Sequence, residues 1–431
     1  MLKKLILENW KSFRYAELYF DPLTVLIGTN ASGKSNLVEA LEFLRRMATG
    51  ETVDVALNGD RSLPPIRGGS QEAIFKVNQL SKPKHSFTLK IVVEENNQDY
   101  LYTIITAAFS LQIRKEFIEW GFQNKAILNQ NDRFYSSQRS CLFTRNFKLS
   151  NYDSINGVDS RTVLKNKPNV DIDNYQKLEA VKSDKYPDFY SQLKAVKSDE
   201  FINKFSSELR SILIINPLPD RMRDYSKLSE KLESDASNIA GVLAALPDEK
   251  KLEIESTLSH YLEHFPEGDI KKIWAEKVGR LGTDAMLYCQ EEWQPGQITE
   301  IDARSMSDGT LRLLGILTAL LTRPEGSLIV IEEIDNGLHP SRAELLVKIL
   351  REIGTKRKID LLITTHNSAL LDALGPEIIP FVTVVHRDAE TGESKLTLLE
   401  DIENLPKLLA TGSLGKLATK GTIEKTLAKS I

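Results

Sequence analysis

The feature of this sequence that most constrains its fold is the loop Gly28-Thr-Asn-Ala-Ser-Gly-Lys-Ser35, which fits the pattern G-x-x-x-x-G-K-[ST]. The apolar run 23–27 before it predicts a strand that is buried on both faces of a sheet. From Ser35 onward, leucine and alanine recur with helical spacing. A strand, this loop and a helix in that order predict a phosphate-binding loop. The alternative is a glycine-rich turn that caps a helix without a ligand.

Each residue type in the 28–35 loop has a physical role in holding a triphosphate. The two glycines let the backbone curl so that successive amides point at phosphate oxygens, and the helix that follows adds its positive N-terminal dipole. Lys34 is expected to bridge the β- and γ-phosphates, and the Ser35 hydroxyl to ligate Mg²⁺. The candidate nucleotide-binding residues in and beside the loop are Gly28, Asn30, Ala31, Ser32, Gly33, Lys34, Ser35 and Asn36.

Two acids and a histidine follow apolar strands much later in the chain. The strand predicted at 328–331 ends in Glu332 and Glu333, and a strand predicted at 361–364 ends two residues before His366. Because ligands bind at the carboxyl ends of parallel strands, these side chains are expected near the 28–35 loop. Glu332 would hold Mg²⁺, Glu333 would polarise the attacking water, and His366 would contact the γ-phosphate or that water. The alternatives are solvated acids and a structural histidine.

A second candidate anion site lies at Ser305-Met-Ser-Asp-Gly-Thr310, before a helix predicted at 311–322. Ser307, the Gly309 amide and the helix start form the kind of site that binds anions. One nucleotide already has its receptor in the 28–35 loop. A second receptor makes sense if two subunits face each other and each offers its 305–310 loop to the nucleotide of the other. The alternative is an ordinary capped helix.

Together these motifs resemble those of the ABC-type ATPases, and specifically the SMC/RecF/OLD branch of DNA-associated ATPases. The segments that carry the resemblance are 28–35 for the Walker A loop, 306–310 for the signature motif, 331–333 for the end of Walker B, 334–340 for the D-loop region and His366 for the switch histidine. The opening segment 5–13 also resembles this branch, and Gly-Leu-His-Pro at 337–340 is similar to the OLD-like group of single-chain ATPases.

The resemblance implies an α/β fold, an ABC-ATPase head with a mixed or parallel sheet and flanking helices, interrupted by a mainly helical insertion. We expect the N-terminal part of the head at 1–111, the insertion arm, mixed and then helical, at 112–292, and the C-terminal part of the head at 293–431. Within the arm, 270–281 is predicted to be an amphipathic helix. The implied activity is hydrolysis of ATP to ADP and phosphate with Mg²⁺, by a homodimer or higher even oligomer that pairs head to tail.

The sequence departs from the family's pattern at two positions and leaves a third uncertain. The first Walker B acid is Glu332, where most ABC proteins carry Asp, and this bears on the metal geometry. Asp308 stands where Gly is usual in the signature motif, and this bears on the reach to the γ-phosphate. Gln71, before a strand expected at 73–77, is the candidate for the Q-loop glutamine that would ligate the metal. A surface glutamine is the alternative.

Composition gives a weak indication of nucleic acid as a partner. The chain carries 56 Lys and Arg against 60 Asp and Glu, so no global basic field is present. The segment 113–167 holds ten Lys and Arg against five acids, interspersed with Trp120, Phe134, Tyr135 and Phe147. Phosphate contacts through this segment would bind duplex DNA. A solvated interaction surface is the alternative.

Further observations bear on location and partners. The apolar runs fall far short of the roughly 20 residues needed to span a bilayer, the N-terminus has no signal-peptide pattern, and the two cysteines fit no metal-ligand spacing. We therefore expect a cytoplasmic protein with no membrane partner. OLD nucleases carry a Toprim domain with paired acids, and the sequence after His366 lacks such a cluster. The effector, such as a nuclease, is then expected to be separately encoded.

Three uses of the ATPase remain open at this point. Nucleotide-gated dimerisation would control DNA engagement or the effector, in phage defence or DNA maintenance. Alternatively, the chain is a regulatory scaffold or sensor that holds a nuclease or toxin subunit, with little direct DNA binding. The third reading is the nucleotide-binding subunit of a membrane transporter, which fits the motifs but not the long insertion or the opening segment.

Overall fold

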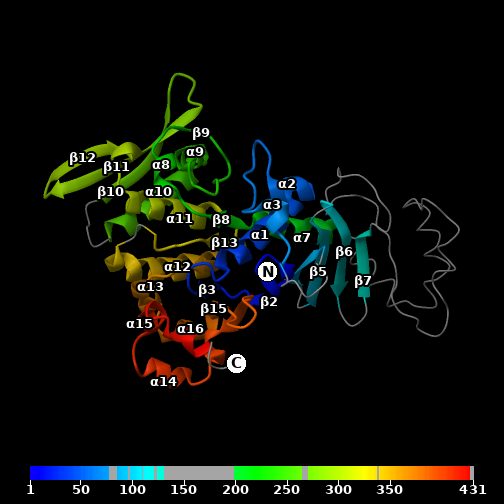
Figure 1. Cartoon of the computed structure of the whole chain (residues 1–431). Helices are drawn as coiled ribbons and strands as arrows, with labels where there is room; N and C mark the ends of the chain where they lie inside the picture. Colours follow the sequence, from blue (N-terminus) through cyan, green and yellow to red (C-terminus); the bar gives the residue numbers. More distant parts are fainter. Residues whose placement is uncertain are drawn as a thin grey trace, which may run out of the picture. The chain divides into compact units, whose positions relative to one another are not determined.

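The computed structural model describes residues 1–76, 85–95, 98–108, 110–120, 124–130, 199–264, 270–336 and 339–427 (Figure 1). The chain divides into two compact units. The first consists of residues 1–11 and 43–210, and the second of residues 12–42 and 211–431. Among the helices that the structure describes, none combines the length and the apolar character that a membrane span requires.

The first unit is built on an antiparallel sheet. Its strands, in spatial order, are β1 (Leu2–Trp10), β4 (Phe87–Glu95), β5 (Gln98–Ala107), β6 (Gln112–Trp120) and β7 (Asn124–Gln130). Its helices are α2 (Val53–Asn58), α3 (Gly69–Glu72) and α7 (Asp199–Ser211). Trp10 packs edge-on against Phe87 with ring centroids 4.8 Å apart, and Phe205 of α7 packs on Tyr102 of β5. Aromatic contacts therefore join two neighbouring strands of this sheet and fix α7 to it.

The second unit contains the parallel sheet that the sequence predicts. Its strands, in spatial order, are β16 (Ser394–Leu398), β15 (Val382–Arg387), β3 (Leu23–Ile27), β14 (Asp360–Thr364), β13 (Leu328–Ile331) and β8 (Leu213–Ile215). From β15 to β8 all neighbours run parallel, and only β16 is antiparallel to its neighbour. The inner strands are apolar and buried, as expected for strands covered on both faces. Their carboxyl ends therefore meet at one edge.

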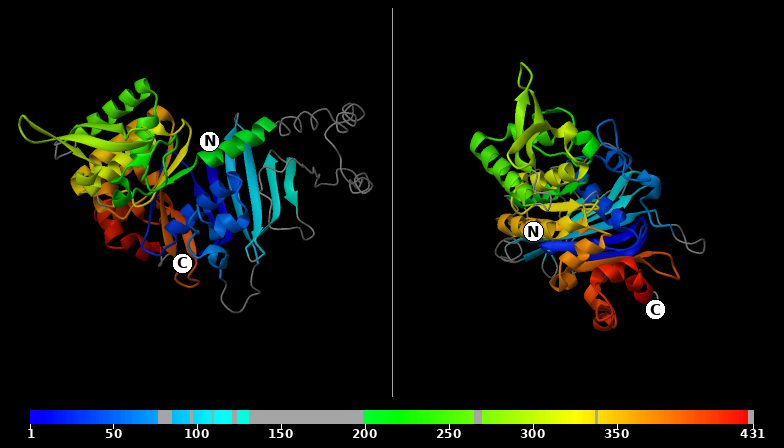
Figure 2. Two further views of the ribbon diagram at one scale, coloured as in Figure 1. Left: turned by 90° about the horizontal axis from the view of Figure 1, so that it is seen from above. Right: turned by 90° about the vertical axis from the view of Figure 1, so that its left-hand side faces the viewer.

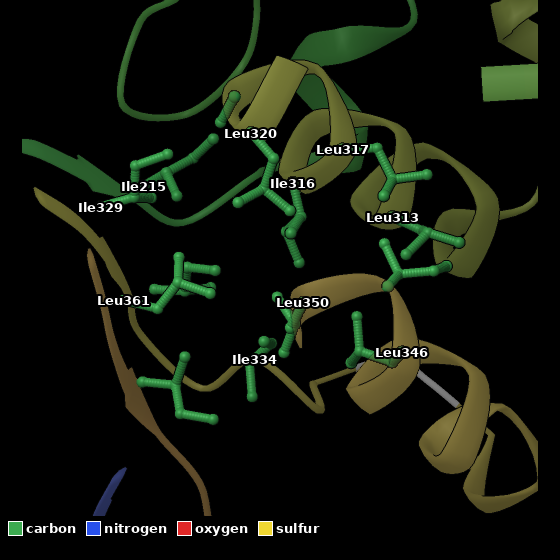
Figure 3. Close-up of a cluster of buried hydrophobic side chains, with 14 of the residues drawn as sticks. Ile215, Leu313, Ile316, Leu317, Leu320, Ile329, Ile334, Leu346, Leu350 and Leu361 are labelled. Carbon is green, nitrogen blue, oxygen red and sulfur yellow. The ribbon is translucent and has the colours of Figure 1, made fainter. Parts of the chain in front are cut away.

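Helices cover this sheet and form the core of the second unit. α11 (Asp308–Thr322) and α12 (Ala343–Arg357) pack together against the sheet. Figure 3 shows leucines and isoleucines from both helices and from three strands meeting in one cluster. The other helices of the unit are α1 (Lys34–Ala48, whose last turns belong to the first unit), α8 (Pro219–Met222), α9 (Ile239–Ala245), α10 (Asp248–Glu263), α13 (Ser368–Ala373), α14 (Leu405–Leu409), α15 (Leu414–Thr419) and α16 (Thr422–Leu427).

A second, antiparallel sheet also belongs to this unit (Figure 2). It contains β9 (Ser226–Lys227), β10 (Ile270–Val278), β11 (Asp284–Gln294) and β12 (Gln297–Asp302), and α9 and α10 pack on it. The helix predicted at 270–281 is therefore wrong. Ile270, Ile273 and Trp274 have helical spacing, but β10 pairs along its length with β11, because Gly279 and Gly282 take left-handed conformations in a turn between the two strands. The described part of 112–292 accordingly mixes strands and helices.

Candidate nucleotide-binding site

The 28–35 loop leaves the carboxyl end of β3 and enters α1 at Lys34, and both of its glycines are required by the geometry. Gly28 has φ +145°, and a Cβ there would collide with the carbonyl oxygen of Val385. Gly33 has φ +121°, and its Cβ would lie 2.7 Å from the hydroxyl oxygen of Ser394. Only glycine combines these dihedral angles with the missing side chain. The strand, loop and helix predicted from the sequence are all present.

The β15–β16 hairpin holds the loop from outside. Arg387 Nε donates to the Ala31 carbonyl at 3.1 Å, and Ser394 Oγ donates to the Ser32 carbonyl at 2.5 Å. Ala31 has a left-handed backbone with φ +62°, which these contacts stabilise. The Asn36 side-chain amide donates to Ser12 Oγ at 2.7 Å at the start of α1. The conformation of the loop is therefore set by groups from both ends of the chain.

Lys34 turns its ammonium group back onto the loop. Its Nζ donates to the carbonyls of Gly28 at 2.7 Å and Thr29 at 2.9 Å, and the residue is 9% exposed. Burial lowers the pKa of Lys34 from 10.5 to about 8, although Glu333 and Glu424 act in the opposite direction. A phosphate group in the loop would supply the negative charge that this buried amine lacks.

Ser32 provides an independent indication that the loop fits a ligand. The residue is 1% exposed, and its hydroxyl has no hydrogen-bond partner among the described residues. Buried hydroxyl groups are normally paired. Together with the desolvated amine of Lys34, this hydroxyl shows that the residues present fit an anion such as a nucleotide phosphate.

The metal would need ligands from the nucleotide as well as from the protein. In the part of the chain that the structure describes, no group of three or more His, Cys, Asp or Glu side chains is placed to hold a metal ion. Mg²⁺ in phosphoryl-transfer sites is held by one or two protein oxygens together with phosphates and waters. Ser35 and Glu332, both half-buried at the sheet edge, have suitable oxygens for this role.

Glu333 lies just beyond β13 in a strained conformation. Its φ is +47°, in the left-handed region that non-glycine residues rarely occupy. The Glu333 amide donates to Thr364 Oγ1 at 2.8 Å, and the Ile334 amide donates to the Thr364 carbonyl at 3.1 Å. Contacts with the end of β14 thus maintain the strain, and the Glu333 side chain is exposed, whereas Glu332 is half-buried. Strain of this kind gathers at functional sites.

His366 follows β14 and lies within electrostatic reach of both Lys34 and Glu333. Burial, and then the positive charge of Lys34, lower the pKa of His366, whereas Asp335, Glu333 and Glu424 act to raise it. The imidazole is therefore mainly neutral at pH 7 and is able to donate or accept a hydrogen bond. The hydroxyl of the preceding Thr365 donates to Asp335. The structure thus brings the amine, the carboxylate and the imidazole to one sheet edge.

Ser307 lies elsewhere on the same unit, as the N-cap of α11. Its Oγ accepts from the Thr310 amide at 3.1 Å and lies 2.8 Å from the Thr310 hydroxyl. Ser307 is exposed, and Gly309 is buried in the first helical turn. In its own subunit, Ser307 therefore acts as an ordinary helix cap, the alternative that the sequence left open. Its exposure leaves it accessible to a second molecule.

Gln71 belongs to the first unit, where it is exposed on α3. The strand expected at 73–77 is not present at 73–76, where Ile74 forms only an isolated bridge with Trp10. Residue 77 lies outside the described residues. The assignment of Gln71 as a metal ligand stays a prediction.

Other predictions fall partly outside the described residues. Within the basic segment 113–167, the structure describes strands β6 and β7 but nothing from 131 onward, so Phe134, Tyr135 and Phe147 lie outside it. Residues 337–338 of the D-loop region also lie outside. Cys289 is buried, and its Sγ lies 3.9 Å from Oε1 of Glu291.

Arg387 and Ser394 were missed by the sequence analysis. They lie far from the 28–35 loop in the chain and match no motif, so only the parallel pairing of β15 with β3 brings them to it. These two residues could have been found from the sequence only if the order of the strands in the sheet had been known.

Comparison with solved structures shows the fold. An Smc head bound to the C-winged helix domain of ScpA superimposes with a TM-score of 0.50 and 11% identity, and covers 92% of this chain and 96% of that chain. The SMC head domain from Thermotoga maritima also matches, with 16% identity and a TM-score of 0.42, over 92% of this chain and 98% of that chain. The Smc head domain with an extended coiled coil from Pyrococcus furiosus matches with 14% identity and a TM-score of 0.46, over 95% of this chain and 99% of that chain. The fold is thus the mixed α/β fold of an SMC-type head.

Comparison with sequence families gives a match over most of the chain. Residues 23–372 match the family described as "AAA domain, putative AbiEii toxin, Type IV TA system". No curated protein matches the sequence. The matched span begins at β3 and ends in α13, so it includes the 28–35 loop, Glu333 and His366. The chain is a member of this AAA domain family.

Proposed function

We propose that this chain binds ATP in the 28–35 loop and hydrolyses it to ADP and phosphate, with two copies paired head to tail so that each encloses the nucleotide of the other. The observation that carries the proposal is the convergence of the buried amine of Lys34 with Glu333 and His366 at one edge of the parallel sheet. Family membership supports nucleotide binding by this edge.

The protein residues perform three tasks in this mechanism. Lys34 and the loop amides hold the β- and γ-phosphates, and preorganised positive groups of this kind stabilise the charge of the transition state. Glu333 orients the attacking water, and the hydrogen bond from its amide to Thr364 holds its backbone at the sheet edge. Neutral His366 hydrogen-bonds the γ-phosphate or the water. Mg²⁺, held by Ser35 and Glu332, would neutralise charge on the phosphates.

The second subunit completes the site in this proposal. The exposed Ser307 and the amide of Gly309 would approach the γ-phosphate from the facing copy, at the positive end of α11. ATP would then hold the two heads together, and hydrolysis would release them. The activity is therefore a switch between two assembly states.

The output of the switch is control of DNA engagement or of a separately encoded effector such as a nuclease, in phage defence or DNA maintenance. The alternative is a regulatory scaffold or sensor that restrains a nuclease or toxin subunit and binds little DNA. The family description names a toxin of a Type IV TA system, which supports a role beside a second protein in either case. The modest charge of 113–167 makes DNA contact the weaker half of the proposal.

The proposal is tested by two substitutions with opposite effects on assembly. Glu333→Gln keeps the shape of the side chain but removes the carboxylate that orients water, so it should trap ATP-bound dimers. Lys34→Ala removes the phosphate-binding cation, so it should abolish ATP binding and leave monomers. Light scattering with and without ATP measures both. If ATP changes the mass of neither the wild-type chain nor Glu333→Gln, gating by dimerisation is wrong.

A separate measurement distinguishes the two outputs. ATP turnover that rises with duplex DNA, together with DNA affinity that falls as salt is added, supports DNA engagement because phosphate contacts release counterions. ATP turnover that does not change when DNA is added, together with co-purification of the product of a neighbouring gene, supports the role as a regulatory scaffold.

A further inference from the structure

A single arginine holds the 305–310 loop from outside. Arg223 follows α8, and its Nη1 lies 3.1 Å from the carbonyl oxygens of both Ala303 and Arg304 and 2.7 Å from that of Met306. Its Nη2 makes an ion pair with the carboxylate of Asp308. One side chain therefore contacts the backbone before Ser307 and the side chain after it.

The contacts use both terminal nitrogens of the guanidinium group, with Nη1 near the carbonyls and Nη2 paired with Asp308. Arginine presents five N–H donors in a rigid planar fork, whereas lysine offers a single flexible point charge. The three carbonyls belong to a 3₁₀ turn at Ala303–Ser305 and to the residue after it, and all point toward one guanidinium nitrogen. Arg223 is only one-quarter exposed, so water competes weakly for these carbonyls. The contacts fix the path of the backbone into Ser307.

The ion pair accounts for the departure of this loop from the family pattern. Asp308 stands where the resembling ATPases usually carry glycine. A carboxylate at that position would repel an approaching γ-phosphate, because like charges a few ångströms apart repel each other. The cation of Arg223 beside Asp308 offsets that charge. Asp308 in turn gives Arg223 an anchor that glycine lacks.

Neighbouring contacts connect Arg223 to the antiparallel sheet of the second unit. Arg223 lies three residues before Ser226 of β9, which pairs with β11. On the other side, a Cβ on Gly315 of α11 would lie 2.9 Å from the side chain of Pro217. The segment that carries Arg223 is thus packed directly on the helix that Ser307 caps.

We propose that Arg223 is a positioning residue for the 305–310 loop. It holds Ser307 and the Gly309 amide in the geometry that the triphosphate of a second copy meets, and it neutralises Asp308 so that the phosphate is not repelled. The idea rests on the proposed function, because it assigns the loop to a nucleotide held by the facing subunit.

The test compares Arg223→Ala with a matched control on the same segment. Arg221→Ala also removes an arginine with one ion pair, to Asp235, but within the described structure Arg221 makes no hydrogen bond or ion pair with the 305–310 loop. Arg223→Ala should lower kcat roughly tenfold or more, as expected for a lost contribution to transition-state stabilisation. The Kd of a fluorescent ATP analogue should change by less than about twofold, because the 28–35 loop is intact. Arg221→Ala should change neither quantity.

A double substitution separates positioning from simple structural damage. Adding Asp308→Gly to Arg223→Ala removes the repelling carboxylate and should raise kcat several-fold above that of Arg223→Ala alone. If Arg223→Ala acted only by damaging the fold, the second substitution would leave kcat the same or lower it further. Arg223→Lys keeps the charge without the fork and should fall between wild type and Arg223→Ala. The proposal would be overturned if kcat were unchanged in Arg223→Ala, or if this variant lost as much ATP affinity as kcat.

A second readout keeps this test separate from that of the proposed function. Amide hydrogen exchange at 303–311 in the nucleotide-free chain should rise roughly tenfold in Arg223→Ala but not in Arg221→Ala, because the loop loses the contacts that close it. If the wild-type chain neither hydrolyses ATP nor assembles, the proposed function fails, and exchange decides alone whether Arg223 holds the loop. Unchanged exchange would show that it does not.

Discussion

The 28–35 loop and the 305–310 loop both lead into a helix N-terminus of the same unit, but their polar groups are used differently. In the first, the Ser32 hydroxyl is buried without a described partner, and the Lys34 amine is desolvated on its own backbone. In the second, the Ser307 hydroxyl is exposed and already caps its helix. The first loop leaves a buried hydroxyl without a partner among the described residues, whereas the Ser307 hydroxyl is satisfied within its own chain.

This difference indicates that the two loops have different roles in the proposed function. The 28–35 loop contains the cation of Lys34, so in the proposed function it is the loop that binds the triphosphate from solution. Arg223, which contacts the backbone before Ser307, is already bound to Asp308 and three carbonyls. The 305–310 loop itself contains no Lys or Arg, so in the proposed function it suits a phosphate that is already held by another surface. The comparison predicts that substitutions in the 28–35 loop abolish ATP binding, whereas substitutions in the 305–310 loop lower only the rate of ATP turnover.

The largest effect is expected from an alanine in place of a loop glycine. Gly33→Ala should weaken ATP binding by more than about a hundredfold, because φ +121° and the 2.7 Å approach to Ser394 leave no room for Cβ. Gly309→Ala lies in an ordinary helical turn and should keep ATP affinity within about twofold while lowering turnover. Titration with a fluorescent ATP analogue measures both affinities. Equal loss of binding in both variants would remove the distinction between the loops.

An intermediate effect is expected from pH. Because the pKa of Lys34 is lowered to about 8, the free protein loses the phosphate-binding charge as pH rises through that value. Bound phosphate favours the ammonium form, so binding above pH 8 must take up a proton, and affinity should weaken by up to about tenfold per pH unit. Below pH 8 the amine is already charged, and affinity should be flat with respect to this group.

Calorimetry in two buffers of different ionisation enthalpy detects this proton directly. The binding heat should depend on the buffer at pH 9 and not at pH 7. Lys34→Arg provides the control, since its guanidinium group stays protonated at both pH values. Heat that is independent of buffer at both values would show that the Lys34 amine is not desolvated as described.

The smallest effect is expected from the two serines. Ser307→Ala removes the N-cap of α11 and should lower the free energy of unfolding by about 1 kcal/mol without affecting ATP affinity. Ser32→Ala removes a hydroxyl with no described partner, so stability should hold, but ATP affinity should fall about fivefold if a phosphate is its missing partner. Denaturant titration with and without ATP measures both. The reverse pattern would contradict the comparison.

Much of the second unit was predictable because its signals are local. The run 328–331 is short and wholly apolar, as expected of a buried strand, and the glycines at 28 and 33 fit the backbone that the loop adopts. The helix predicted at 270–281 failed for the opposite reason. Its apolar residues suit a helix or a strand, and pairing with β11, a tertiary contact, decided between them.

The supporting groups of both loops were beyond sequence reasoning for the same reason. Arg387 and Arg223 belong to no motif, and each reaches its loop only through the folded arrangement of strands and helices. Glu333 is an intermediate case. Its position after a strand was readable, but its left-handed backbone and the hydrogen bond from its amide to Thr364 depend on the neighbouring strand.

The central claim, that each nucleotide is shared between two copies, is tested most directly by mixing two inactive variants. Lys34→Ala has a defective 28–35 loop, and Ser307→Arg has a defective 305–310 loop. In a head-to-tail pair that contains one copy of each variant, one nucleotide site combines the two defective loops and the other combines the two intact loops. Mixing should therefore restore ATP turnover well above the sum of the separate variants. A mixture no more active than that sum would contradict the account.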